Sequence, residues 1–159
     1  MMRPLALLLV ATPALAARTQ EPASMEALTD RATDVVRGTV VATRTVERGY
    51  EVRTTYTVRP THTLKGQVER SLAITLPGGW IDGTQVQATG VPVWATGAEV
   101  LVFLVDGKPQ SLDGLFTVDE GALIDPLSRP AAIAPLTIDA AAERISDAVR
   151  GASHNSTGG

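Results

Sequence analysis

The segment Glu51–Leu64, which reads EVRTTYTVRPTHTL, decides the fold. The mostly apolar set holds the even positions: Val52, Thr54, Tyr56, Val58, His62 and Leu64. The polar set holds the odd positions: Glu51, Arg53, Thr55, Thr57, Arg59, Thr61 and Thr63. A period of two residues predicts a long β-strand with one buried and one solvated face. Pro60 cannot donate to a sheet ladder, so it marks either an edge or a bulge.

Further β-strands are predicted on both sides of this segment. The valines around Gly38 predict a strand from Asp34 to about Arg48 that is bent or bulged at the glycine. The unbroken apolar run Glu99–Val105 predicts the central buried strand. A shorter strand is expected at Leu72–Leu76, and one or two more around Leu115–Val118 and Ala122–Ile124. The stretch from Trp80 to Gly97 is expected to be a long connection with one short strand.

A helix is expected at each end of the strand series. Ser24 can cap a short helix with Glu26 in its first turn. Thr137 can cap a second helix that ends at Gly151. The sequence therefore predicts a mainly β fold. We expect a small OB-like β-barrel of five or six strands, with a short N-terminal helix and a C-terminal helix, in preference to a sandwich.

The first residues have the order of a secretory signal peptide. Met1-Met2-Arg3 precedes an apolar stretch and then Pro13-Ala14-Leu15-Ala16, which is typical of a cleaved leader. The apolar stretch is shorter than the roughly 20 residues of a membrane span. We expect an exported protein, periplasmic or secreted. The predicted parts are a signal peptide (1–16), a polar leader with a short helix (17–33), the barrel (34–125), a connection with the C-terminal helix (126–151) and a disordered tail (152–159).

Composition excludes several classes of chemistry. The chain of 159 residues has no cysteine, so disulfides, thiolate metal sites and cysteine nucleophiles are excluded. Its formal net charge is −3, without any block of like charge, which argues against nucleic acid as a partner. No later segment is long and apolar enough to span a membrane after signal cleavage. We expect no cofactor.

No catalytic constellation is recognisable in the sequence. The only histidines are His62 and His154, and an isolated His62 is more typical of a hydrogen-bonded core or rim imidazole than of a catalyst. The hydrolase, phosphate-loop, dinucleotide, zinc-protease and EF-hand motifs are all missing. The acidic residues that could gather around a cation fit better as turn residues; they are Asp106, Asp113, Asp119, Glu120 and Asp125. We therefore expect no enzymatic activity and no catalytic or metal site.

Both tryptophans flank one glycine-rich region. Trp80 follows Gly78 and Gly79, and Trp94 lies in the same long connection. Exposed aromatic side chains on a loop commonly anchor a partner, whereas a large indole is also often buried for packing. The partner-binding hypothesis rests on Trp80, Trp94, Gly78 and Gly79, and the alternative is that both indoles cover the open end of the barrel.

These observations favour an exported, non-enzymatic binding module that engages an extracytoplasmic protein, peptide or glycan through the loop between Gly78 and Trp94. One alternative is a structural protein of the envelope or of an extracellular assembly. A less favoured alternative is an unfamiliar hydrolase that uses His62 and acidic residues.

Three short motifs, in their order after a signal peptide, suggest a family. They are Ala32–Val41 (ATDVVRGTVV), Leu64-Lys65-Gly66, and Gly97 with Glu99 before Leu101–Leu104. In this order the chain resembles the exported OB-like domain of tissue inhibitors of metalloproteinases and netrin-type modules, and uncharacterised bacterial secreted proteins of the same plan. The resemblance covers about Ala32 to Val118 and implies the architecture and a binding role.

The inhibitory chemistry of that family is not implied for this chain. Those inhibitors place a cysteine amine and carbonyl, freed at the mature N-terminus, on the catalytic zinc of a protease. Cleavage after Ala16 would instead leave Ala17-Arg18-Thr19, and the chain lacks every cysteine of the family's disulfides.

Overall fold

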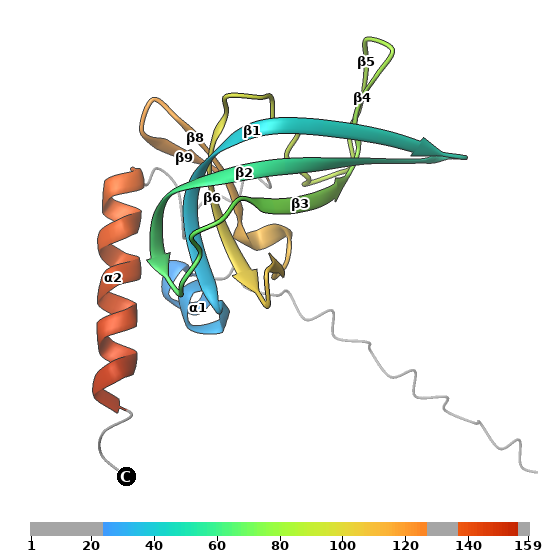
Figure 1. Cartoon of the computed structure of the whole chain (residues 1–159). Coiled ribbons are helices and arrows are strands. Elements are labelled where there is room, and N and C mark those ends of the chain that lie inside the picture. Colours follow the sequence, from blue (N-terminus) through green and yellow to red (C-terminus); the bar gives the residue numbers. More distant parts are fainter. Residues whose placement is uncertain (1–23, 127–136, 156–159) are drawn as a thin grey trace, which may run out of the picture.

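The computed structural model describes residues 24–126 and 137–155, which form a mainly β structure with a helix before and a helix after the strands (Figure 1). The helices are α1 (Met25–Arg31) and α2 (Ile138–Asn155). The strands are β1 (Asp34–Arg48), β2 (Glu51–Lys65), β3 (Leu72–Pro77), β4 (Gly79–Ile81), β5 (Thr84–Val86), β6 (Glu99–Val105), β7 (Lys108–Pro109), β8 (Leu115–Asp119) and β9 (Ala122–Ile124), with a 3-10 turn at Leu112–Gly114. The predicted class, mainly β with two flanking helices, is confirmed.

The main sheet is antiparallel and open. Its strand order is β3-β2-β1-β6-β8-β9, and β7 adds to β6. Strands β4 and β5 form a separate two-stranded hairpin. β3 and β9 are the two ends of the hydrogen-bonded ladder, so the closed barrel that the sequence suggested is not observed. The connection after β3 is also more ordered than expected, because it contains two short strands where we expected one.

β6 is the central strand, as its apolar run predicted. Val100, Val102 and Leu104 face one apolar cluster, and Leu101 and Phe103 face the other. A strand that is covered on both faces needs apolar residues at every position, which explains why β6 shows no alternation.

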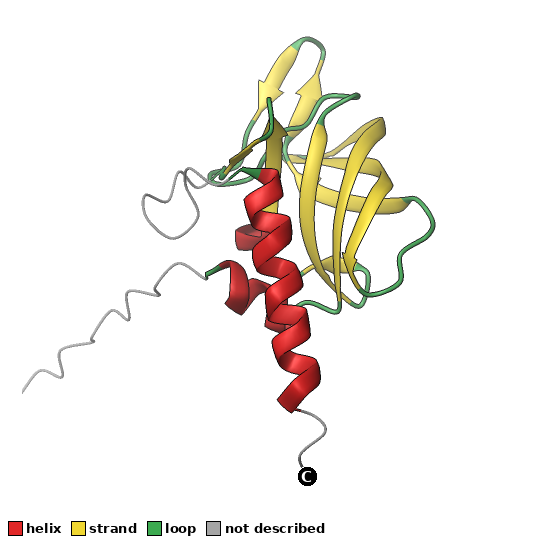
Figure 2. Cartoon of the chain, turned by 90° about the vertical axis from the view of Figure 1, so that its left-hand side faces the viewer, coloured by secondary structure: helices red, strands yellow, loops and turns green. Residues whose placement is uncertain are grey.

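The two helices cover one face of the sheet (Figure 2). Met25 and Leu28 of α1 and Ile145 of α2 pack against Phe103 and Phe116, and all five side chains are fully buried. We call this the helix-side core. The caps are those that the sequence predicted, since Ala27 N–H donates to Ser24 Oγ (3.1 Å) and Ala140 N–H donates to Thr137 Oγ1 (3.2 Å).

The other face of the sheet forms a second core, which we call the inner core. It takes Ile74 from β3 and Leu115 from β8, so side chains from nearly opposite ends of the ladder share one interior. Trp94 and Val91 from the connection before β6 complete it. The sheet is therefore strongly curved, and apolar side chains rather than backbone hydrogen bonds fill the gap between β3 and β8.

β1 is bulged where the sequence placed a bend. Its register against β2 steps between Arg37 and Gly38 and again past Val41. A Cβ added to Gly38 would lie 2.7 Å from the Arg59 carbonyl oxygen, so only glycine allows the two strands to approach this closely.

β2 follows its predicted parity only as far as Pro60. Thr54, Tyr56 and Val58 are buried as expected, but His62 is exposed, so the prediction of an inward-facing His62 is wrong. Thr61 has no partner on β1, because the neighbouring residues Arg37 and Gly38 pair with His62 and Pro60. One extra residue exchanges the two faces of the strand beyond that point. Leu64 accordingly packs against the helix-side core instead of the inner core.

Two-residue turns join four of the strand pairs. Asp82-Gly83, Asp106-Gly107 and Glu120-Gly121 have positive φ at both positions, which is the type I′ geometry that matches the twist of a hairpin. Gly49-Tyr50 closes the β1–β2 hairpin with a positive φ at the glycine alone.

Some boundaries differ from expectation or lie outside the described residues. α2 continues to Asn155, four residues beyond Gly151, where we expected it to end. The signal peptide and residues 17–23 of the polar leader, together with residues 127–136 and 156–159, lie outside the described ranges, so the predicted signal cleavage stays a prediction. The predicted disordered tail (152–159) is wrong for residues 152–155, which belong to α2.

Candidate binding surface

Trp80 lies on the β4–β5 hairpin, which projects from the main sheet (Figure 1). Its side chain is 56% exposed, and Val86 on the partner strand is 41% exposed. Burying an indole on binding removes a large apolar area from water, so an exposed tryptophan on a projecting hairpin suits partner recognition.

Gly78 and Gly79 fix the root of this hairpin. Both have positive φ, +91° and +143°. Gly78 N–H donates to the Val52 carbonyl (2.8 Å), and Thr54 Oγ1 donates to the Gly78 carbonyl (2.7 Å). A Cβ on Gly79 would lie only 1.9 Å from Thr54 Oγ1. The two glycines therefore position Trp80 and offer no side chain of their own to a partner.

Trp94, unlike Trp80, is buried, because only 3% of its surface is exposed. Its ring meets Tyr56 edge-on, with centroids 5.1 Å apart, and its Nε1 donates to Thr117 Oγ1 (2.9 Å). Burial raises the pKa of the Tyr56 phenol. Trp94 thus covers the inner core, as the packing alternative expected for both indoles, whereas Trp80 is exposed at the surface.

The outer end of the β1–β2 hairpin is a second exposed surface, beside the first. It extends beyond β3 and β6 on the side away from α2 (Figure 1). Tyr50 at its turn is fully exposed, and Val46 is 40% exposed. One face carries a hollow of about 230 Å³. Its lining residues are Val46, Arg48, Glu51, Arg53, Thr55 and Thr75.

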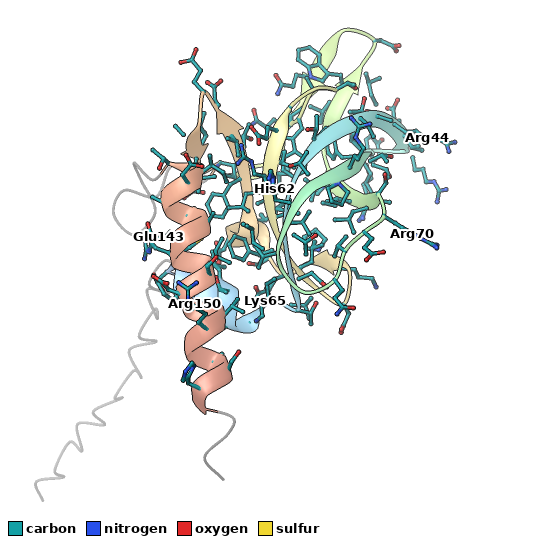
Figure 3. The ribbon with its side chains drawn as sticks, turned by 60° about the vertical axis from the view of Figure 1, so that its left-hand side comes forward. Arg44, His62, Lys65, Arg70, Glu143 and Arg150 are labelled. Atoms are coloured by element: carbon teal, nitrogen blue, oxygen red, sulfur yellow. The ribbon has the colours of Figure 1, made fainter. Side chains whose placement is uncertain are left out.

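Charge is distributed unequally between the two halves of the sheet. Residues 37–70, which hold most of β1, all of β2 and the following loop, contain seven Arg or Lys and three Asp or Glu. Residues 71–126 contain one Lys and seven Asp or Glu. Figure 3 shows Arg44 and Arg70 directed outward, away from Glu143 and Arg150 on α2. This partition does not appear as a block of like charge in the sequence, but a count of charges along the predicted strands reveals it.

The remaining candidate residues do not converge on a site. His62 is exposed on β2, and Asp106 and Glu120 occupy two-residue turns. Asp113 lies in the 3-10 turn and Asp119 ends β8. Within residues 24–126 and 137–155, no three His, Asp or Glu side chains come together in a group that could hold a metal ion. No described helix has the length and apolar character of a membrane span.

Comparison with known proteins adds no family. The sequence matches no protein-family model, and no curated protein matches it.

Proposed function

We propose that this chain is an exported, non-enzymatic binding module that engages an extracytoplasmic protein, peptide or glycan through the Trp80 hairpin. The observation that carries the proposal is the combination of exposure and rigidity at Trp80. The side chain is more than half exposed, yet the root of its hairpin is fixed by the Val52 and Thr54 hydrogen bonds.

Rigidity matters because binding costs less entropy when the contact side chain is already positioned. Tryptophan is also the residue type most enriched among the side chains that dominate binding energy. A flexible loop with the same residue would lose part of that energy on ordering. The two-residue Asp82-Gly83 turn and the tight root at Gly79 therefore support a recognition role for the hairpin.

The proposal is tested by capture of partners from the extracytoplasmic fraction of the native host. Tagged wild type is compared with Trp80→Ala, and Ile124→Ala serves as a control because it removes an exposed apolar side chain from β9, outside both candidate surfaces. We expect Trp80→Ala to lose the captured partner and Ile124→Ala to retain it. Equal capture by all three proteins would exclude the Trp80 hairpin as the binding site.

Export is proposed from the N-terminal sequence and has a direct test. Mass spectrometry of the chain recovered from the extracytoplasmic fraction should give a mature N-terminus at Ala17. An intact Met1 terminus in that fraction would contradict cleavage.

We also propose that the fold is a relative of the OB-like, netrin-type domain. Support comes from the partly open form that OB barrels can take and from the single interior shared by β3 and β8. An experimental structure with β3 and β8 facing each other across Trp94 would support this relationship, and a flat sheet would exclude it.

A further inference from the structure

We infer that the outer edge of β1, residues 41–48, accepts an extended acidic peptide segment as an added strand. The inference rests on the proposed binding function and specifies how the partner is held: by backbone hydrogen bonds along β1 and by pairing of its carboxylates with arginine.

The edge of β1 beyond Val40 has no backbone partner among the described residues. β2 pairs with β1 along nearly its whole length, but β6 pairs with it only as far as Thr39. Val40 is the last residue bonded on that side, through its N–H to Ala98 (2.9 Å) and its carbonyl to Gly97 (2.7 Å). From residue 41 to 48, no backbone bond is made on that side to any part of the chain that the structure describes. A free edge offers unpaired donors and acceptors to another strand.

Alternate residues of this segment turn their backbone groups toward the free edge. The Val52 carbonyl accepts from Gly78 on the β3 side, so Val52 directs its backbone groups away from β1. Val52 pairs with Glu47, and both members of such an antiparallel pair turn away from each other. The alternation then directs the groups of Thr43, Thr45 and Glu47 toward the free edge.

Two arginines lie on one face of this β1 segment. Arg44, Val46 and Arg48 share the face that also carries Thr55, because Arg44 pairs with Thr55 while Val46 and Arg48 line the same hollow as Thr55. The side chain of neither arginine makes a hydrogen bond or an ion pair with a described residue, whereas that of Arg53 pairs with Glu51 (2.6 Å). An added strand would place alternate side chains opposite Arg44, Val46 and Arg48. The complementary pattern is acidic, apolar and acidic at every second residue.

The same β1 segment lies beside the start of the Trp80 hairpin. A Cβ on Gly79 would lie 3.0 Å from Thr45 Oγ1, so the root of the Trp80 hairpin rests against the middle of this β1 segment. A strand added to the edge passes that root, and one partner could therefore contact both the edge and Trp80.

Charged residues on an edge strand can also serve to prevent pairing with other chains. The two roles differ in a measurable way. An arginine that only prevents pairing with other chains disfavours every added strand or has no effect on it. An arginine that recognises a partner discriminates between acidic and basic peptides of the same length and β propensity.

The test is a titration of the isotope-labelled full chain, followed by amide NMR, with a capped seven-residue peptide of sequence Thr-Glu-Thr-Val-Thr-Glu-Thr. The control peptide replaces both glutamates by lysine. We expect shifts at Thr43, Thr45 and Glu47, and we expect the basic peptide to bind at least about fivefold more weakly, since opposite charges stabilise a cross-strand pair and like charges destabilise it. Equal binding of the two peptides would overturn the inference.

Two sets of variants complete the test. Thr43→Pro removes one outward N–H at a position where an edge strand tolerates proline, and Thr43→Val keeps that N–H. We expect the first to abolish peptide binding and the second to retain it within about twofold. Arg44→Glu combined with Arg48→Glu should exchange the preference, so that the lysine peptide binds better. Should Thr43→Pro fail to fold, the acidic peptide N-methylated at alternate residues provides the same comparison with wild type, and undiminished binding would overturn the inference.

Partner capture separates this inference from the proposed function. If Trp80→Ala loses the native partner and Thr43→Pro retains it, the Trp80 hairpin stands as the binding site and strand addition is excluded. If both variants retain the partner, both ideas fail. Loss of the partner with both variants supports the proposed function and strand addition together.

Discussion

Trp94 Nε1 donates a 2.9 Å hydrogen bond to Thr117 Oγ1 on β8, while the edge contact of its ring with Tyr56 reaches β2. One indole therefore spans the inner core between two strands that the ladder does not bring together. Its neighbour Val91, from the same connection, is also buried. This connection thus acts as a cover for the interior.

We predict that Trp94→Ala lowers the free energy of unfolding by about 3–5 kcal/mol, the usual cost of truncating a buried tryptophan. Trp94→Phe should cost less, because it keeps an aromatic ring beside Tyr56 and loses the bond to Thr117. Urea unfolding followed by circular dichroism measures both.

Trp80→Ala is the matched control for the two Trp94 variants. It should change the free energy of unfolding by no more than about 0.5 kcal/mol, as is usual for exposed positions. Tryptophan fluorescence gives an independent check, since the Trp94 signal should be blue-shifted relative to that of Trp80. Similar destabilisation by Trp80→Ala and Trp94→Ala would contradict the burial described for Trp94.

We predict that Gly79→Ala destabilises the fold by about 1–3 kcal/mol, because the new Cβ meets Thr54 Oγ1 and φ lies in a region that alanine rarely adopts. Gly83→Ala is the control, since its φ is also positive but nothing lies within 4 Å. It should cost less than Gly79→Ala in thermal unfolding. The reverse order would show that the hairpin root is not tightly packed.

We predict that Glu120→Asn raises stability by roughly 0.5–1 kcal/mol, because asparagine tolerates the left-handed backbone better than glutamate does. Glu120 has a φ of +47° in the β8–β9 turn. Glu120→Gln removes the same charge without this conformational gain and should leave stability nearly unchanged. A gain of equal size in both variants would assign the effect to charge instead.

The Glu26–Arg144 pair should make stability depend on pH. The hydrogen bond from Arg144 lowers the pKa of Glu26 from its ordinary value of 4.5, and the two side chains meet at 2.7 Å through both carboxylate oxygens. A carboxyl group whose pKa is lower in the folded state stabilises the fold at pH values above its unfolded-state pKa. This stabilisation is lost as the pH falls through the folded-state pKa.

Both side chains are more than one third exposed, so the contribution should stay below about 1 kcal/mol. Glu26→Gln should therefore be less stable than wild type at pH 7 by no more than that amount, and the difference should shrink below pH 4.5. Urea unfolding of both proteins at pH 7 and pH 3 tests this. A difference that stays constant with pH would show that the ion pair does not contribute.

Much of the fold follows from local sequence patterns. The unbroken apolar run of β6, the valines around Gly38 and the alternation up to Val58 each predicted a strand that the structure confirms. Ser24 and Thr137 predicted the first turns of the helices, because capping depends on residues within three positions along the chain.

The features that sequence reasoning missed depend on contacts between distant strands. The step in pairing opposite Thr61, which exposes His62, is set by how β2 meets β1. Whether β3 and β8 pair through backbone hydrogen bonds depends on how the side chains of the whole inner core pack. The β4–β5 hairpin is the exception, since Asp82-Gly83 is the strongest short-range hairpin signal and could have been recognised.

The same local reasoning could not separate the two tryptophans. Trp80 and Trp94 occupy similar glycine-rich surroundings in the sequence. Only the arrangement of Tyr56 and Thr117 around Trp94 buries one of them.

The partition of charge has a consequence for how the molecule meets others in solution. A basic β1–β2 half and an acidic half beyond residue 70 give the protein an electric dipole, so an approaching anionic partner is turned toward the hairpin before any contact forms. Encounter rates should fall steeply as added salt screens this field. When salt is removed, copies of the protein should also attract one another, with the basic half of one molecule facing the acidic half of the next.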